Sequence, residues 1–273
     1  MLKEDAQKRS EGRSEQVRGA EKSRAREASA FCLGVVLICA LTELLGLAKG
    51  DRLVFPNVGE ILSAFFRLLS SPRTYQQIGT TLLHLVISMA FSTVIGVTLG
   101  LLEGASDFAR QVLKPLTVFL RSIPMIVLVV IVMVLANYER VPVIVSTLAL
   151  IPLISEAANE GSRRIDREWK DVYRMDGRFG MRVLFKVHLP LMAGYLKQAY
   201  ISAVGMGIRL AVSTEYLVQT KNSLGKAIYS SSYFNEYADI YAYALIMILL
   251  VLLVGEAPSA IARLLSSRRQ SPS

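Results

Sequence analysis

The sequence predicts an all-α membrane protein with six transmembrane helices, and three observations support this fold class. Of the 273 residues, 52% are hydrophobic and only 19% are charged, whereas soluble domains have about 45–50% and about 25%. The charged residues are gathered in blocks. Between these blocks lie apolar stretches close to the roughly 20 residues that a helix needs to cross the hydrocarbon core.

The apolar stretches place the expected crossings along the chain. The six segments are residues 30–47, 81–102, 112–136, 141–157, 192–218 and 237–261. Between the first two, residues 55–71 (FPNVGEILSAFFRLLSS) carry apolar side chains at helical spacing, with Asn57 placed to cap the helix. This segment is too short and too amphipathic to cross, so we expect it to lie along the membrane surface.

The distribution of basic residues predicts the orientation. With the N-terminus in the cytoplasm, inside segments hold 21 Lys and Arg residues and outside segments hold seven. Basic residues gather in cytoplasmic loops, so we expect both termini inside the cell. The predicted organisation is a charged cytoplasmic tail at 1–29, a membrane domain at 30–265 with a long basic loop at about 159–190, and a cytoplasmic tail at 266–273.

Composition excludes several other classes of function. The net charge of +9 follows from loop topology and does not indicate nucleic-acid binding. Cys32 and Cys39 both lie in the first apolar stretch, where they are interpreted as packing residues, and His84 and His188 are interpreted as structural. The sequence has no GxxxxGK[ST], HExxH or GxSxG motif. If the protein uses ATP, another chain must bind it.

The basic loop contains a spaced motif within DVYRMDGRFGMRVLFKVHLP, residues 171–190. An acidic residue opens it, a glycine follows six positions later, and Leu-Pro closes it. This pattern resembles the EAA loop of ABC-transporter membrane subunits, in which E-A-A and a glycine precede I-x-L-P. The positions that match, and that the resemblance assigns to ATPase coupling, are Asp171, Val172, Tyr173, Gly177, Val187, Leu189 and Pro190.

Two details qualify the motif. The family's two small alanines are Val172 and Tyr173 here, bulky residues at the contact with the ATPase. A literal EAA occurs at residues 156–158, but Gly161 follows it one residue too early and nothing like I-x-L-P follows at the right distance. Pro190 favours the first turn of a helix, which fits the start of the fifth crossing.

Other stretches extend the resemblance over most of the chain, from residue 30 onward. Residues 51–66, 113–131, 205–218 and 223–234 are similar to segments of the nitrate/sulfonate/taurine-type ABC permeases, with Ser122 where a proline is common. The resemblance implies a type I-like importer permease of the cytoplasmic (inner) membrane, with a coupling helix between crossings four and five. It implies alternating-access transport of a small solute: a small anion such as a sulfonate or nitrate, or a vitamin-precursor-like molecule.

The resemblance also implies a set of partners. These are two ATP-binding cassette subunits that carry ATP and Mg²⁺, a second permease copy or a paralogue, and an extracytoplasmic substrate-binding protein. The chain itself would bind no cofactor and act as no enzyme. The alternatives are a secondary transporter, which would be expected to show internal inverted repeats, and a membrane-embedded enzyme, which would need clustered catalytic groups. Both would work without an ATPase.

Polar residues at membrane depth are the candidates for the substrate path. Charged side chains there are costly and face protein or water. Arg209 and Glu215 in the fifth crossing, and Arg121 and Ser122 in the third, meet this description, and Pro124 predicts a kink that opens toward a cavity. Alternatively, Arg121 snorkels to the interface and Arg209 forms a structural pair with Glu215.

Overall fold

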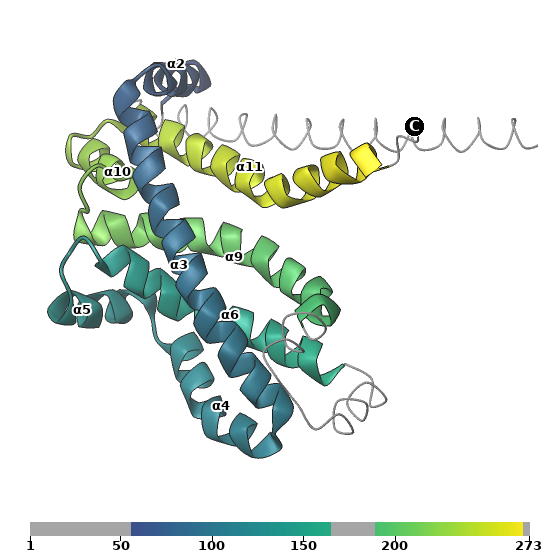
Figure 1. Cartoon of the computed structure of the whole chain (residues 1–273). Coiled ribbons are helices and arrows are strands. Elements are labelled where there is room, and N and C mark those ends of the chain that lie inside the picture. Colours follow the sequence, from purple (N-terminus) through teal and green to yellow (C-terminus); the bar gives the residue numbers. More distant parts are fainter. Residues whose placement is uncertain (1–55, 165–188, 270–273) are drawn as a thin grey trace, which may run out of the picture. The chain divides into compact units, whose positions relative to one another are not determined.

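The computed structural model describes residues 56–164 and 189–269 and shows helices joined by short connections in this part of the chain (Figure 1). The predicted first crossing, both predicted tails and most of the basic loop lie outside the described residues, so the count of six crossings stays a prediction. The helices described are α2 (Val58–Leu69), α3 (Pro72–Ala105), α4 (Asp107–Ser122), α5 (Met125–Leu135), α6 (Val141–Arg163), α9 (Leu189–Val218), α10 (Leu224–Tyr233) and α11 (Tyr237–Arg269).

Four of these helices are long and apolar enough to cross a membrane, namely α3, α6, α9 and α11. The predicted and the observed helix ends agree at three places: α6 begins at Val141, α9 ends at Val218 and α11 begins at Tyr237. Helix α3 begins nine residues before the predicted start at 81 because its first turns carry polar residues, such as Thr74 and Gln77, whose side chains are buried. A hydropathy pattern gives no sign of such residues.

The third predicted crossing is not one straight helix. Helices α4 and α5 are bent by 102° relative to each other. The cause is Pro124: a proline disfavours the helical conformation of the residue before it, and Ile123 is extended, with φ −68° and ψ 125°. Helix α4 begins at Asp107, where the Ser106 hydroxyl accepts a hydrogen bond from the Ala109 N–H. Counting the bent pair as one span, the described residues supply up to five.

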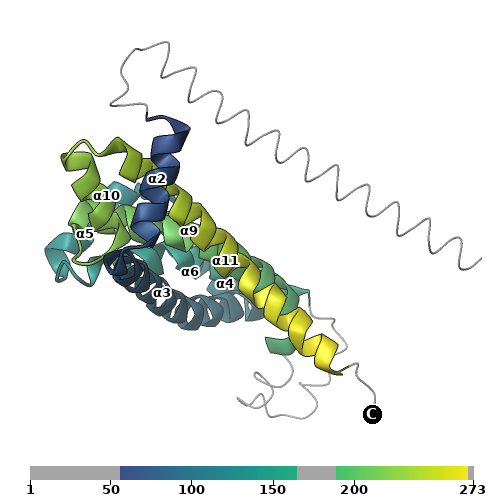
Figure 2. The ribbon, with the colours of Figure 1, turned by 90° about the horizontal axis from the view of Figure 1, so that it is seen from above.

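Helix α3 packs most extensively on α6, and Figures 1 and 2 show it crossing both α6 and α9. Three glycines, at positions 96, 100 and 104, permit the close approach. A Cβ added at Gly100 would lie 2.3 Å from the Ser155 carbonyl oxygen and 2.6 Å from the Ala158 Cβ. Small residues four apart let helix backbones meet in membranes, where packing drives association. This α3–α6 contact is the framework on which α4 is placed.

The short helix predicted between the first two crossings is confirmed as α2. The Asn57 N–H donates to Glu60 Oε2 at 3.0 Å, which is one half of a capping box. Its placement on the membrane surface remains a prediction.

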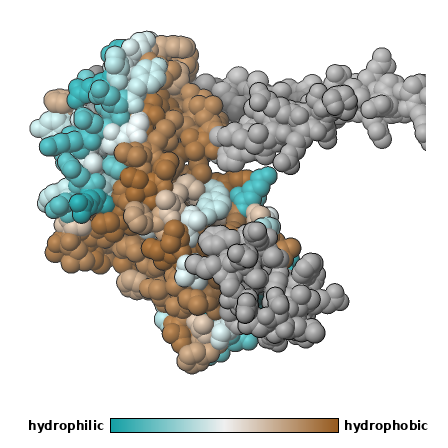
Figure 3. Space-filling view, viewed as in Figure 1, coloured by the Kyte–Doolittle hydropathy of each residue, from teal (hydrophilic) through white to brown (hydrophobic). Residues whose placement is uncertain are grey.

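Large apolar side chains are widely exposed on α3 and α5. Figure 3 shows a broad hydrophobic face, with hydrophilic residues gathered near α10. Phe91 and Val94 on α3 are 56% and 68% exposed, and Val134 and Leu135 on α5 are 81% and 79% exposed. Contiguous apolar surface of this extent marks contact with lipid or another protein. The prediction of a multi-pass membrane protein agrees with it.

Candidate functional site

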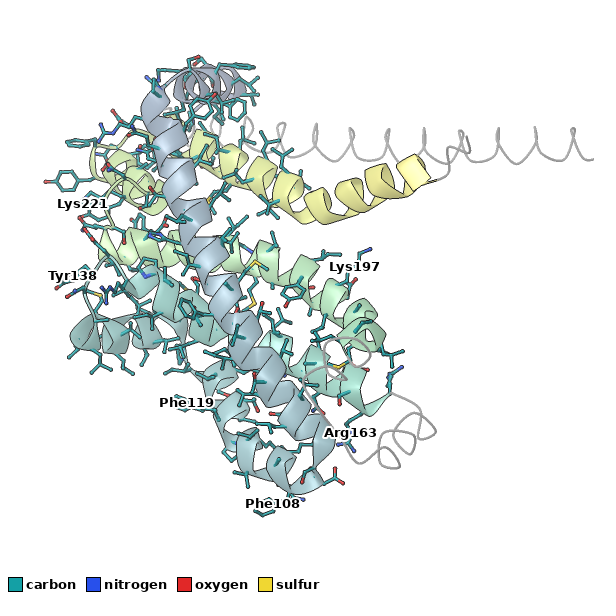
Figure 4. The ribbon with its side chains drawn as sticks, in the orientation of Figure 1. Phe108, Phe119, Tyr138, Arg163, Lys197 and Lys221 are labelled. Atoms are coloured by element: carbon teal, nitrogen blue, oxygen red, sulfur yellow. The ribbon has the colours of Figure 1, made fainter. Side chains whose placement is uncertain are left out.

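A polar cavity of about 590 Å³ lies among α3, α4 and α6. Its lining residues are Glu103, Asp107, Arg110, Gln111, Lys114, Thr117, Val118, Arg121, Pro152, Glu156 and Asn159. Three of these are acidic and three are basic, so the formal charges cancel. Helix α4 supplies seven of them, while its apolar residues Phe108 and Phe119 point outward (Figure 4).

Two ion pairs tie α4 to α6 at this cavity. Arg121 donates to the carboxylate of Glu156, and Arg163 Nη1 lies 3.2 Å from Asp107 Oδ1. All four side chains are at least 42% exposed, and exposed ion pairs each contribute only about 0–1 kcal/mol. The pairs therefore position the two helices without locking them together.

The inner wall of the cavity holds a buried carboxylate that sequence reasoning missed. Glu103 is 6% exposed, and Asn159 Nδ2 donates to its Oε2 at 3.2 Å. Glu103 Oε1 and Asn159 Oδ1 are both buried and accept no hydrogen bond from the described residues. One sequence signal could have identified Glu103. It lies one residue before Gly104, the last of the three glycines on α3 that pack against α6.

A second, apolar cavity of about 260 Å³ adjoins the break between α4 and α5. It shares Arg121 and Pro152 with the polar cavity, and α9 contributes Met206 and Leu210. Arg121 therefore stands between a polar and an apolar space, three residues before Pro124. Ser122 is exposed and lines neither cavity.

Arg209 and Glu215 do not meet, so the suggested structural pair between them is wrong. Arg209 is exposed, its Nε donates to the Gly205 carbonyl oxygen at 3.1 Å, and it lines neither of the two cavities. In the described part of the chain it has no ion-pair partner.

Glu215, which is fully buried, instead joins α3, α9 and α10 in a hydrogen-bond network. Its Oε2 accepts from Thr81 Oγ1 at 2.8 Å and from the Gly225 N–H at 3.2 Å, and His84 Nδ1 lies 2.7 Å from Oε1. The Leu224 N–H donates in turn to Thr81 Oγ1 at 3.1 Å. A buried charge needs such partners. The carboxylate is enclosed by protein donors, which favours a structural role.

The motif predicted for ATPase coupling falls largely outside the described residues. Leu189 and Pro190 are described, and they open α9, with Pro190 in its first turn as expected. The literal EAA at residues 156–158 lies inside α6, where Ala158 is fully buried. The positions outside the described residues are Asp171, Val172, Tyr173, Gly177 and Val187.

Comparison with known proteins gives the class of this chain. Residues 92–271 match the family described as the binding-protein-dependent transport system inner membrane component. The match covers more than half of the sequence, and the chain belongs to this family. It is therefore a multi-pass inner-membrane protein of a family of transport components.

The individual relatives are more distant. The chain is 25% identical over 146 residues to the glycine betaine/carnitine transport permease protein GbuB of Listeria monocytogenes serotype 1/2a (strain 10403S), a match of 53% of this chain and 50% of the relative. The chain thus spans about half the length of the curated relative it matches.

Solved structures support the fold. Two crystal forms of the MetNI methionine ABC transporter, in inward-facing conformations, superpose on this chain with TM-scores of 0.57 and 0.56 at 18% and 19% identity. Each match covers 69% of this chain and 92% of the other chain. The chain has the fold of a type I importer permease, while the finer likeness to nitrate/sulfonate/taurine permeases remains a prediction.

Proposed function

We propose that this chain is the membrane-spanning permease subunit of an ATP-driven ABC importer that moves a small solute by alternating access. The family match over residues 92–271 carries this proposal. It spans the basic loop, the broken α4–α5 segment and all of α6, α9 and α11.

The geometry at the α4–α5 break suits alternating access. Two spaces of different polarity meet at Arg121, and the ion pairs that join α4 to α6 there are exposed. Breaking and remaking such pairs costs little. Helix α4 can therefore shift about the extended residues Ile123 and Pro124 while the tightly packed α3–α6 framework stays fixed.

The partners would supply the energy and the selectivity. Two ATP-binding cassette subunits bind ATP and Mg²⁺ and close on each other, and residues 171–190 pass this motion to α9 through Leu189 and Pro190. A second copy or a paralogue completes the pathway, and an extracytoplasmic binding protein delivers the solute. Six crossings with both termini in the cytoplasm place the loop on the ATPase side.

The solute is proposed from the candidate path residues. Arg121, at the junction of the two cavities, favours a solute that carries an anionic group. A small anion such as a sulfonate or nitrate meets this requirement, whereas a vitamin precursor without an anionic group does not.

Uptake into proteoliposomes tests the proposal. The chain would be reconstituted with the ATPase and binding protein encoded beside it, using the solute that this binding protein retains. Uptake should require MgATP on the side of the membrane where the ATPase is bound. Uptake driven by an ion gradient, with no ATPase present, would instead identify a secondary transporter.

A further inference from the structure

We propose that the polar cavity binds a small zwitterion, with its primary ammonium group held by Glu103 and Asn159 and its acidic group held by Arg110 and Lys114. The assignment rests on the proposed transport function and names the class of solute that the site takes. It begins from the two buried acceptors, Glu103 Oε1 and Asn159 Oδ1, that accept no hydrogen bond from the described residues.

The charges of the cavity are divided in a way that suits a dipolar ligand. Arg121 is paired with Glu156, and Asp107 is paired with Arg163. This leaves three ionic side chains of the lining without an ion-pair partner among the described residues. They are the buried Glu103, on α3, and the exposed Arg110 and Lys114, on α4.

The difference in burial between these groups gives the ligand an orientation. A negative charge is buried at the α3–α6 wall, while two cations stand on the exposed side of α4. A positive group therefore gains most by going deep, and a negative group gains most at the rim. Charge-assisted hydrogen bonds in a partly desolvated space are the strong ones, so a zwitterion satisfies both ends of the cavity.

The chemistry of the acceptors selects a primary ammonium group. A carboxylate oxygen and an amide oxygen both need N–H donors, which an ammonium supplies three at a time and a trimethylammonium group lacks. Both residues line the cavity, and the terminal torsions of Glu and Asn are broad, so the carboxylate and the amide can rotate to meet a ligand. The volume of about 590 Å³ lies within the roughly 300–1,000 Å³ of small-molecule sites.

A metal ion fits the cavity less well. Among the described residues, no group of three or more His, Cys, Asp or Glu side chains could hold one. The adjacent cations, Arg110 and Lys114, would also repel it. An organic cation with its own anionic group avoids this repulsion.

The test uses the purified full-length chain in nanodiscs, without ATPase or binding protein. Binding is measured by equilibrium dialysis for unbranched ω-amino acids of two to six carbons. The series of lengths determines which distance between the amine and the acid matches the cavity. Each is compared with its N-trimethyl analogue and with the carboxylic acid that lacks the amine. We expect one or two lengths to bind at least about tenfold more tightly than both analogues.

Variants assign the binding to named residues. Glu103→Gln should weaken binding of the best amino acid about tenfold or more. The matched control is Glu160→Gln, which changes an exposed carboxylate on α6 that does not line the cavity and should leave binding unchanged. Lys114→Ala changes an exposed side chain, so folding is preserved. It should weaken binding of the amino acid while leaving unchanged the binding of the alkylamine of the same chain length, which lacks the acidic group and is measured as a further probe.

Three results would overturn the assignment. These are no binding of any ω-amino acid by the wild type, equal binding of the trimethyl analogue, or binding that both Glu103→Gln and Lys114→Ala leave unchanged. The binding assay contains no ATPase. If any of these results is found while ATP-dependent uptake is intact, only the class of ligand is rejected. Loss of the ATP requirement for uptake would reject the proposed function instead.

Discussion

The close approach of α3 to α6 at Gly100 gives the sharpest prediction for stability. Gly100 is part of a glycine series on α3, and an added Cβ there would lie 2.3 Å from the Ser155 carbonyl oxygen and 2.9 Å from the Asn159 nitrogen. Ordinary contact begins at 3.4 Å. Because both atoms belong to the backbone of α6, no side-chain rotation relieves the clash, and Gly100→Ala must push the two helices apart by about 1 Å.

The cost follows from the general cost of overpacking. Inserting a methyl group into a close-packed interior costs about 1–3 kcal/mol, and a backbone clash that separates a whole helix pair belongs at the upper end. At about 2–4 °C per kcal/mol for a chain of this size, Gly100→Ala should lower the midpoint of thermal unfolding by about 6–12 °C. The assay is the loss of monodisperse protein on heating in one fixed detergent.

Gly79→Ala on the same helix is the matched control. A Cβ at Gly79 meets nothing within 4 Å, and alanine is the better helix former by about 1 kcal/mol. This variant should be unchanged or slightly more stable. If Gly100→Ala loses no more stability than Gly79→Ala, the argument that α3 and α6 meet through glycine is refuted.

Three further predictions concern the polar network, the ion pair and the break. Glu215→Ala should destabilise the protein by about 3–5 kcal/mol, because it leaves buried donors without their acceptor, and thermal unfolding measures this; an unchanged midpoint would contradict the network. Arg121→Glu alone should reduce uptake, and combining it with Glu156→Arg should restore uptake if the pair only positions α4. Failure of the double exchange would instead show that Arg121 contacts the solute. Pro124→Ala should let α4 and α5 straighten, so spin labels on the two helices should move apart; an unchanged distance distribution would show that packing, and not proline, sets the 102° bend.

The long apolar runs made much of the fold predictable. The starts of α6 and α11 and the end of α9 agree with the sequence because each coincides with an abrupt change in hydropathy. The start of α3 was missed because buried polar residues such as Thr74 and Gln77 resemble a loop when only hydropathy is considered. Pro124 signalled a kink, and its full effect depended on Ile123 also being extended.

The site was less predictable because its contacts join residues far apart in the chain. Thr81 and Glu215 are 134 positions apart, and Glu103 and Asn159 are 56 apart. No local pattern distinguishes a buried, fully partnered Glu215 from one that faces a solute. The glycine spacing that brings Glu103 against α6 is visible in the sequence, yet its meaning depends on which helix it contacts.

The central claim is that this chain works with an ATPase that docks on its basic loop, and co-purification tests it most directly. The chain would be expressed with the ATPase encoded nearest to it, and wild type compared with Gly177→Arg and with Gly180→Arg, the same change three residues away. The account predicts that the ATPase co-purifies with wild type and Gly180→Arg and is lost with Gly177→Arg. If wild type retains none of the ATPases encoded in the genome, the importer account is contradicted and a secondary transporter takes its place.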